Sequence, residues 1–207
     1  MQSIYFVDSN FTYESSKKSI LSIRYATDGF SFCVHDETEK LVVFVHEPYA
    51  ADSREAVVAK LKNYVVNDTI LNLRFKKVYI MPCFKEKLLV PGAFFDKANI
   101  ATLYTVNQEV SPDDTILYHH IEGIEAYLVE TVISSFHDFV REHFPVVQIV
   151  NGAYPFILGA MSKALRDTEQ IFLDIQDNYF DLLFIRDSGI QPVSYTHLRA
   201  HETGRNL

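Results

Sequence analysis

The stretch S-I-L-S-I-R-Y-A-T-D-G-F-S-F (residues 19–32) decides the fold of this chain. It contains two apolar, β-rich runs, residues 20–26 and 30–35, and an Asp-Gly pair at positions 28–29 separates them. Asp-Gly between such runs is typical of a two-residue hairpin loop in which both positions adopt positive φ. A third β-rich run, residues 41–46, follows a short polar connection. The sequence therefore predicts a three-stranded antiparallel meander.

Helices and strands are predicted to alternate after the meander. Val57, Leu61 and Val65 recur at helical spacing, and they indicate an amphipathic helix over residues 53–66. Asp52 is the predicted N-cap, and Glu55 is its partner in a capping box. The other predicted helices cover residues 132–144 and 154–165, with a weaker one over 96–105. Further strands are predicted over residues 76–83, 88–91, 116–121, 125–130 and 146–150.

The segment 170–186 repeats the pattern of the opening hairpin. It consists of a strand, an Asp177-Asn178 turn, an aromatic residue and a second strand. Phe30 in the first hairpin corresponds to Tyr179 in the second, and this correspondence suggests an internal duplication. Strand alternation places the odd-numbered residues of 171–175 on one face and the even-numbered ones on the other.

Three stretches carry a resemblance to a known family: residues 19–32, L-L-V-P-G-A-F-F-D (88–96) and F-L-D-I-Q-D-N-Y-F-D-L (172–182). With them the chain resembles the uncharacterised bacterial family called domain of unknown function 3822. The resemblance implies an α/β fold with a mixed sheet, the actin-like ATPase fold, in which two ribonuclease-H-like domains flank a nucleotide cleft. Residues 1–166 would form the first domain, and residues 167–191 would begin a truncated second one.

The last residues look foreign to the protein. V-S-Y-T-H-L-R-A-H-E-T (193–203) resembles a translated sequencing-library adapter, so we expect residues 193–207 to be an artefact and the natural frame to stop near residue 192. Without this tail, which holds two cations and one anion, the net charge changes from −8 to −9.

The phosphate-binding hairpins of actin-like ATPases lack their usual residues here. The resemblance implies an Asp at the end of each leading strand, where Tyr25 stands in the first hairpin and Asp174 in the second. Gln176 replaces an expected glycine and obstructs close approach of a phosphate. Asp174 and Asp177 are therefore only candidate binding residues for ATP with magnesium, and no catalytic residue is predicted. The alternative is a divergent ATPase whose adenosine site lies in the missing carboxyl-terminal part.

Composition and charge exclude several classes of function. A net charge of −8 argues against nucleic-acid binding and against attraction to an anionic membrane. The sequence contains no long apolar run and no signal peptide, and its two cysteines, Cys33 and Cys83, suit buried thiols in a reducing compartment. His119 and His120 would point to opposite faces of a strand, so no metal site is predicted.

We therefore expect a cytoplasmic, catalytically silent module that binds an unknown protein partner. A scaffold for bacterial envelope machines is a further possibility.

Overall fold

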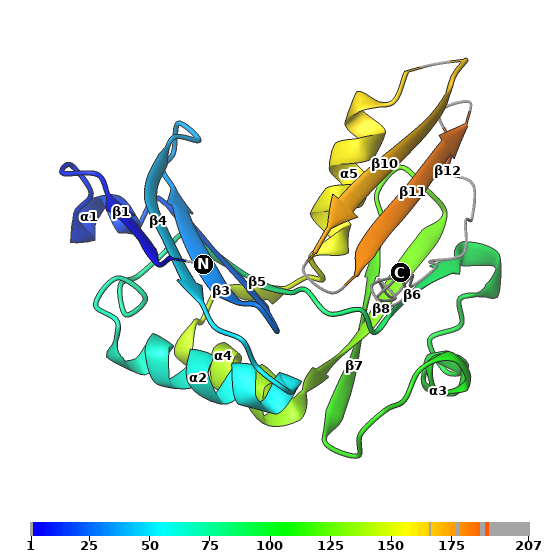
Figure 1. Cartoon of the computed structure of the whole chain (residues 1–207), viewed down its shortest axis with the longest axis horizontal. Helices are drawn as coiled ribbons and strands as arrows, with labels where there is room; N and C mark the ends of the chain where they lie inside the picture. Colours follow the sequence, from blue (N-terminus) through cyan, green and yellow to red (C-terminus); the bar gives the residue numbers. More distant parts are fainter. Residues whose placement is uncertain (1, 166, 177–178, 187–188, 191–207) are drawn as a thin grey trace, which may run out of the picture.

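A six-stranded mixed sheet, the main sheet, forms one half of the protein (Figure 1). The structure is a computed structural model that describes residues 2–165, 167–176, 179–186 and 189–190. The strand order in the main sheet is β1-β4-β3-β2-β5-β9. Its members are β1 (Ile4–Val7), β2 (Ile20–Ala26), β3 (Gly29–His35), β4 (Leu41–Pro48), β5 (Lys77–Pro82) and β9 (Val147–Ile149).

The predicted meander is confirmed, but its first loop differs from the prediction. β2, β3 and β4 pair antiparallel, and β5 and β9 extend the sheet in parallel. Ala26 pairs with Gly29, so the two loop residues are Thr27 and Asp28, and the positive φ of +133° belongs to Gly29 alone. Glycine is required there because a Cβ atom would collide with the backbone carbonyl of Glu47 at the end of β4.

Gly29→Ala is expected to destabilise the protein by about 1–3 kcal/mol. Alanine would have to adopt the strained positive φ, and its Cβ atom would collide with the carbonyl of Glu47. Gly159→Ala is the matched control. Gly159 lies in α5, and a Cβ atom added there would enter open space, so its substitution by alanine is expected to stabilise the protein by roughly 0.5–1 kcal/mol. Urea denaturation of both variants tests the prediction, and a Gly29 variant as stable as the Gly159 variant would contradict it.

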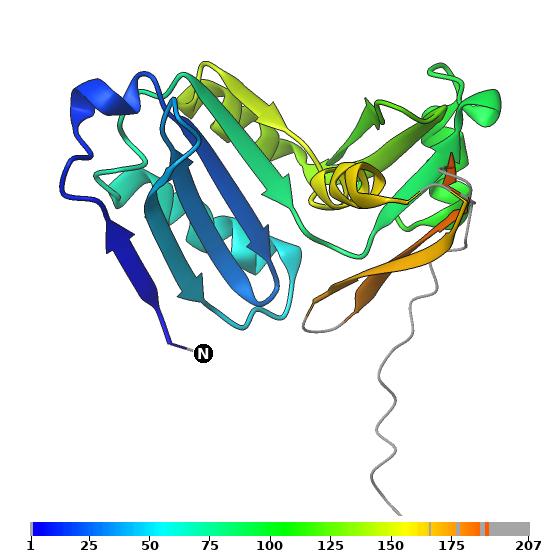
Figure 2. The ribbon, with the colours of Figure 1, turned by 90° about the horizontal axis from the view of Figure 1, so that it is seen from above.

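Two helices cover one face of the main sheet (Figure 2). They are α2 (Arg54–Asn67) and α4 (Ser134–His143). The predicted N-cap of α2 was wrong: the Ser53 hydroxyl, not Asp52, accepts the hydrogen bond from the Ala56 amide. The predicted start of α4 at residue 132 was also too early, because β8 continues to Ile133. The core beneath these helices includes Val57, Leu61, Val65, Phe136 and Val140 from the helices and Leu21, Ile23, Tyr25, Phe32 and Ile80 from the strands.

A second, antiparallel sheet, the middle sheet, is inserted between β5 and α4. Its order is β6-β8-β7, with β6 (Lys87–Pro91), β7 (Asp114–His120) and β8 (Ala126–Ile133). A short 3-10 helix, η1 (Gly92–Phe94), and α3 (Ile100–Asn107) lie between β6 and β7. α3 begins later than the predicted helix over residues 96–105. Val90, Val129, Ile100 and Tyr104 form a small core between α3 and this sheet.

A third sheet begins after α5 (Ala153–Lys163). It contains β10 (Glu169–Ile175), β11 (Phe180–Arg186) and β12 (Gly189–Ile190) in that order. The sequence predicts that the helix over residues 154–165 packs on the main sheet together with the helices over 53–66 and 132–144, and for α5 this prediction was wrong. Its buried Ala153, Ile157 and Ala160 share a core with the middle and third sheets instead, through Ile121, Leu128, Leu183 and Ile185.

The predicted alternation of β10 is confirmed. Ile171, Leu173 and Ile175 are 62%, 53% and 78% exposed, whereas Phe172 packs against the α5 core. Opposite the three exposed residues stand Phe184, Leu182 and Phe180 of β11, so this face of the hairpin is apolar.

The adapter-like segment 193–207 and Asp177 lie outside the described residues. β1 and the short helix α1 (Tyr13–Ser16) were not predicted. None of the described helices is long and apolar enough to cross a membrane.

Candidate functional site: a cleft closed by Arg24

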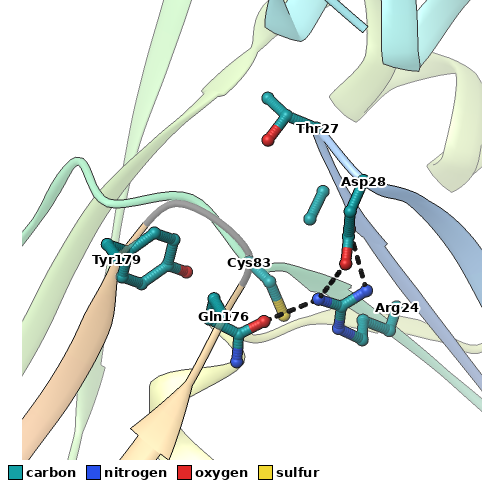
Figure 3. A pocket seen from close by; sticks show the side chains of 7 residues that line it. Arg24, Thr27, Asp28, Cys83, Gln176 and Tyr179 are labelled. Carbon is teal, nitrogen blue, oxygen red and sulfur yellow. Dashed lines mark hydrogen bonds and ion pairs between the residues drawn. The ribbon is translucent and has the colours of Figure 1, made fainter. Parts of the chain in front are cut away.

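The first hairpin of the main sheet and the first hairpin of the third sheet face each other across a narrow cleft (Figures 1 and 3). The cavity between them is about 10 Å³, which is room for about one water molecule. Sites that hold small molecules usually measure about 300–1,000 Å³. The cavity lined by the described residues is therefore too small for a nucleotide. Its lining residues are Arg24, Ala26, Thr27, Asp28, Cys83, Gln176 and Tyr179.

A chain of four side chains closes the cleft, and we call it the Arg24 clasp. The two terminal nitrogens of Arg24 each donate to one carboxylate oxygen of Asp28, both at 3.2 Å. Arg24 Nη2 also donates to Gln176 Oε1 at 2.6 Å, across the cleft (Figure 3). Gln176 Nε2 in turn donates to Asp174 Oδ2 at 2.8 Å. The clasp thus joins the loop after β2 to the end of β10 through charge-assisted hydrogen bonds.

Strand alternation explains why Arg24, and not Tyr25, reaches the cleft. Ile23 and Tyr25 point into the core of the main sheet, so Arg24 between them points to the other face. The Tyr25 ring is fully buried and packs edge-on against Phe84 and Phe136, at centroid distances of 5.4 and 5.1 Å. The position that the resemblance matched to an Asp is therefore a core position.

The sequence-predicted candidates fall differently around the cleft. Asp174 lies at the cleft hairpin, but its Oδ2 is engaged by Gln176. Gln176, which was expected to obstruct the approach of a phosphate, lines the cavity, and its effect on phosphate binding stays a prediction. Asp177 is outside the described residues. Arg24 was not singled out from the sequence, although a charged residue inside an apolar strand, four residues before Asp28, was a signal that could have found it.

Two further side chains at the cleft have shifted acidities. Burial raises the pKa of the Cys83 thiol to about 11, so Cys83 remains protonated and unreactive at neutral pH. Its sulfur lies against Gly152 at the start of α5, where any larger residue would displace it. Burial also raises the pKa of the Tyr179 phenol well above its usual range, so Tyr179 is neutral. Neither group supplies a nucleophile or a base.

The histidine pair is divided between two environments. His119 is partly buried and faces Glu130, and His120 is exposed and lies beside the Tyr127 ring at a centroid distance of 5.0 Å. Across the described part of the chain, no group of three or more His, Cys, Asp or Glu side chains is placed to hold a metal ion.

Two hairpins from separate sheets, facing each other across a cleft beside a β-β-β-α-β arrangement, define the actin-like ATPase fold. The chain belongs to the family described as "Protein of unknown function (DUF3822)", whose model matches residues 8–191. The resemblance seen in the sequence is thereby confirmed.

A solved structure from Bacteroides thetaiotaomicron, described as a protein with actin-like ATPase fold and unknown function, has a TM-score of 0.79 to this chain. The two are 21% identical, and the match covers 87% of this chain and 70% of that one. At this identity the likeness shows the fold alone. A search of curated proteins found no match.

Two more distant structures also match. One is a ROK family transcriptional regulator, a homologue of the E. coli MLC protein, with 9% identity, a TM-score of 0.45 and coverage of 87% of this chain and 40% of that one. The other is an Aquifex aeolicus member of the Ppx/GppA family, with 10% identity, a TM-score of 0.36 and coverage of 84% and 49%. Neither likeness bears on function.

Proposed function

We propose that this protein is a catalytically silent actin-like module that acts in the cytoplasm by binding another protein. The observation that carries the proposal is the Arg24 clasp. In this fold the cleft between the two hairpins is where ATP phosphates would lie, and here Arg24, Asp28 and Gln176 of the clasp line a cavity of only about 10 Å³.

Opening the cleft for a nucleotide would be costly. Arg24 makes three hydrogen bonds in the clasp, and a hydrogen bond to a charged group contributes roughly 1.5–3 kcal/mol. Removing Arg24 from Asp28 would also leave a carboxylate beside the incoming triphosphate, where like charges repel. The nearest acid on the other side, Asp174, already has Gln176 as its partner. These costs support the proposal that the cleft holds the two hairpins together and does not turn over a nucleotide.

The surface supports a protein partner. Phe94 and Val106 are 74% and 79% exposed and line a groove of about 350 Å³ beside α3. Exposed apolar groups that gather around a groove are typical of interaction sites. The net charge of −8 favours a protein over a nucleic acid as the partner.

Measurement of ATP hydrolysis tests the silent cleft. We expect no magnesium-dependent release of phosphate above a protein-free control, either from the wild type or from Asp174→Ala. Magnesium-dependent turnover that disappears in Asp174→Ala would favour the alternative, a divergent ATPase that uses Asp174.

Site-specific photo-cross-linking in cells tests the binding half of the proposal. A cross-linking residue in place of Phe94 is expected to give a discrete protein adduct, and one in place of the exposed Glu142 on α4 is the matched control. Identical adduct patterns from both positions, or none from Phe94, would count against a partner at the α3 groove.

A further inference from the structure

A buried cluster of ionisable side chains lies where the middle sheet meets the third sheet. Lys87 comes from β6, His119 from β7, Glu130 from β8 and Asp181 from β11. Asn151, in the turn between β9 and α5, completes the cluster through a hydrogen bond to Glu130. The cluster has no part in the Arg24 clasp, and it connects two sheets that are otherwise held by the apolar core around α5.

An ion pair crosses between the two sheets. Lys87 Nζ lies 2.9 Å from Asp181 Oδ1, and the two side chains are only 1% and 3% exposed. Lys87 also donates to the carbonyl of Phe84 at 3.2 Å, and it lies 4.8 Å from the centre of the Tyr179 ring. Because Asp181 belongs to β11, this ion pair attaches the hairpin β10–β11 to the middle sheet.

Glu130 stands beside the same ammonium. It is directly opposite Lys87 in the β6–β8 register, so both side chains leave the sheet on the same face with their Cβ atoms about 5 Å apart. Its Oε2 accepts from Asn151 Nδ2 at 2.8 Å. Its Oε1 has no hydrogen-bond partner among the described residues, and the imidazole Nε2 of His119 lies 3.9 Å from it.

Among the described residues, the cluster holds two carboxyl groups, of Glu130 and Asp181, and the ammonium of Lys87. Burial raises the pKa of Glu130 to about 8, so Glu130 keeps its proton at pH 7. The ammonium of Lys87 then forms its ion pair with Asp181. Burial lowers the pKa of His119 below its usual 6.5, so His119 brings no positive charge. The nearby phenols and thiol are also uncharged, and Arg54 already pairs with Asp114 at 2.6 Å. The phenols are those of Tyr25, Tyr104 and Tyr179, and the thiol is that of Cys83.

We propose that Glu130 is a proton-controlled competitor of Asp181 for the Lys87 ammonium, so that loss of its proton loosens the hairpin β10–β11 from the middle sheet. The protonated carboxyl group of Glu130 needs no counter-charge. The uncharged imidazole Nε2 of His119 lies 3.9 Å from its Oε1. The ionised carboxylate, by contrast, is a buried charge, and the ammonium of Lys87 opposite it in the register is already paired with Asp181. The device is a pH-sensitive attachment, and it does not depend on what the cleft binds.

The sign of the pH dependence follows from linkage. The pKa of Glu130 is higher in the attached state than its usual 4.5, so the attached state holds a proton that the detached state gives up. Attachment is therefore most stable at low pH and weakens as pH rises toward about 8, above which the effect levels off. His119 acts with the opposite sign, but only below about pH 6.5. The window from about pH 6.5 to about 8 isolates Glu130.

Hydrogen exchange of the β10–β11 amides, corrected for the intrinsic rate, measures the attachment. In the 207-residue chain the opening equilibrium of these amides is expected to rise by close to tenfold per pH unit between about pH 6.5 and 8, and then to level off. In Glu130→Gln, which keeps the shape and the bond to Asn151, the dependence should vanish. The exposed Glu122→Gln is the matched control and should behave as the wild type. Amides of β2–β3 are the internal reference.

A pH dependence of the same size in the wild type and Glu130→Gln would overturn the proposal, as would a wild-type hairpin with no dependence in this window. If Glu130→Gln does not fold, carboxyl ¹³C spectra of the glutamate-labelled wild type decide the question. A carboxyl that titrates near pH 8 in the folded chain is the expected result, and glutamates that all titrate near their usual pKa would overturn the proposal.

Discussion

Tyr25→Asp is expected to unfold the main sheet instead of creating a nucleotide site. The Tyr25 ring is 2% exposed and packs edge-on against Phe84 and Phe136 in the centre of the core. The substitution removes both aromatic contacts and buries a carboxylate among apolar side chains, so we expect a loss of more than ~4 kcal/mol in the free energy of unfolding.

Urea denaturation followed by circular dichroism measures this loss. Tyr25→Phe is the matched control, because it keeps the ring in place and is expected to cost less than about 1.5 kcal/mol. A Tyr25→Asp variant as stable as Tyr25→Phe would show that residue 25 can turn toward the cleft. The resemblance would then have matched the catalytic position correctly.

Lys87→Met is the second substitution with a large expected effect. It leaves the Asp181 carboxylate buried without the ammonium 2.9 Å away, and breaking a buried ion pair in this way costs about 3–5 kcal/mol. The double variant Lys87→Met/Asp181→Leu removes both charges and is expected to recover most of that loss, because a well-packed apolar pair replaces a buried ion pair at little cost.

Lys85→Met is the control two residues away. Lys85 pairs with Glu86 at 3.7 Å on the surface, where an ion pair is worth about 0–1 kcal/mol. Unfolding free energies from urea titrations at one pH compare the three variants. A Lys87→Met variant no less stable than Lys85→Met would contradict the assignment of Lys87–Asp181 as the attachment of the third sheet.

The sequence predicted well those features that depend on neighbouring residues. The β-rich residue pattern identified β2 and β10, and alternation along β10 placed Ile171, Leu173 and Ile175 on one face, because successive side chains of a strand point to opposite faces. Helical spacing located α2 and α4 to within a few residues. The domain boundary near residue 166 and the foreign origin of residues 193–207 stay predictions.

The sequence-based predictions were wrong where contacts between distant parts of the chain determine the structure. Gly29 takes the strained φ because the end of β4 comes close to it, and α5 leaves the main sheet because Leu183 and Ile185 complete its core. The cleft shows the same limit. Arg24 and Gln176 are separated by 152 positions in the chain, so no local pattern could pair them. Alternation could have placed Arg24 on the side away from the core, but it could not have shown that the second hairpin meets Arg24 there.

Titration of the ¹⁵N-labelled chain with magnesium ATP, and separately with magnesium pyrophosphate, tests the closed cleft most directly. Pyrophosphate probes the phosphate end alone, so the result does not depend on where adenosine would bind. Thr27 and Asp28 line the cavity and Gly29 follows them at the start of β3, so the amide signals of these three residues report on any occupant of the cleft. Because the Arg24 clasp fills the cleft, we predict no saturable shift of these amides with either ligand. Saturable shifts in the wild type that disappear in Asp174→Ala would contradict the closed cleft and establish a phosphate site between the hairpins.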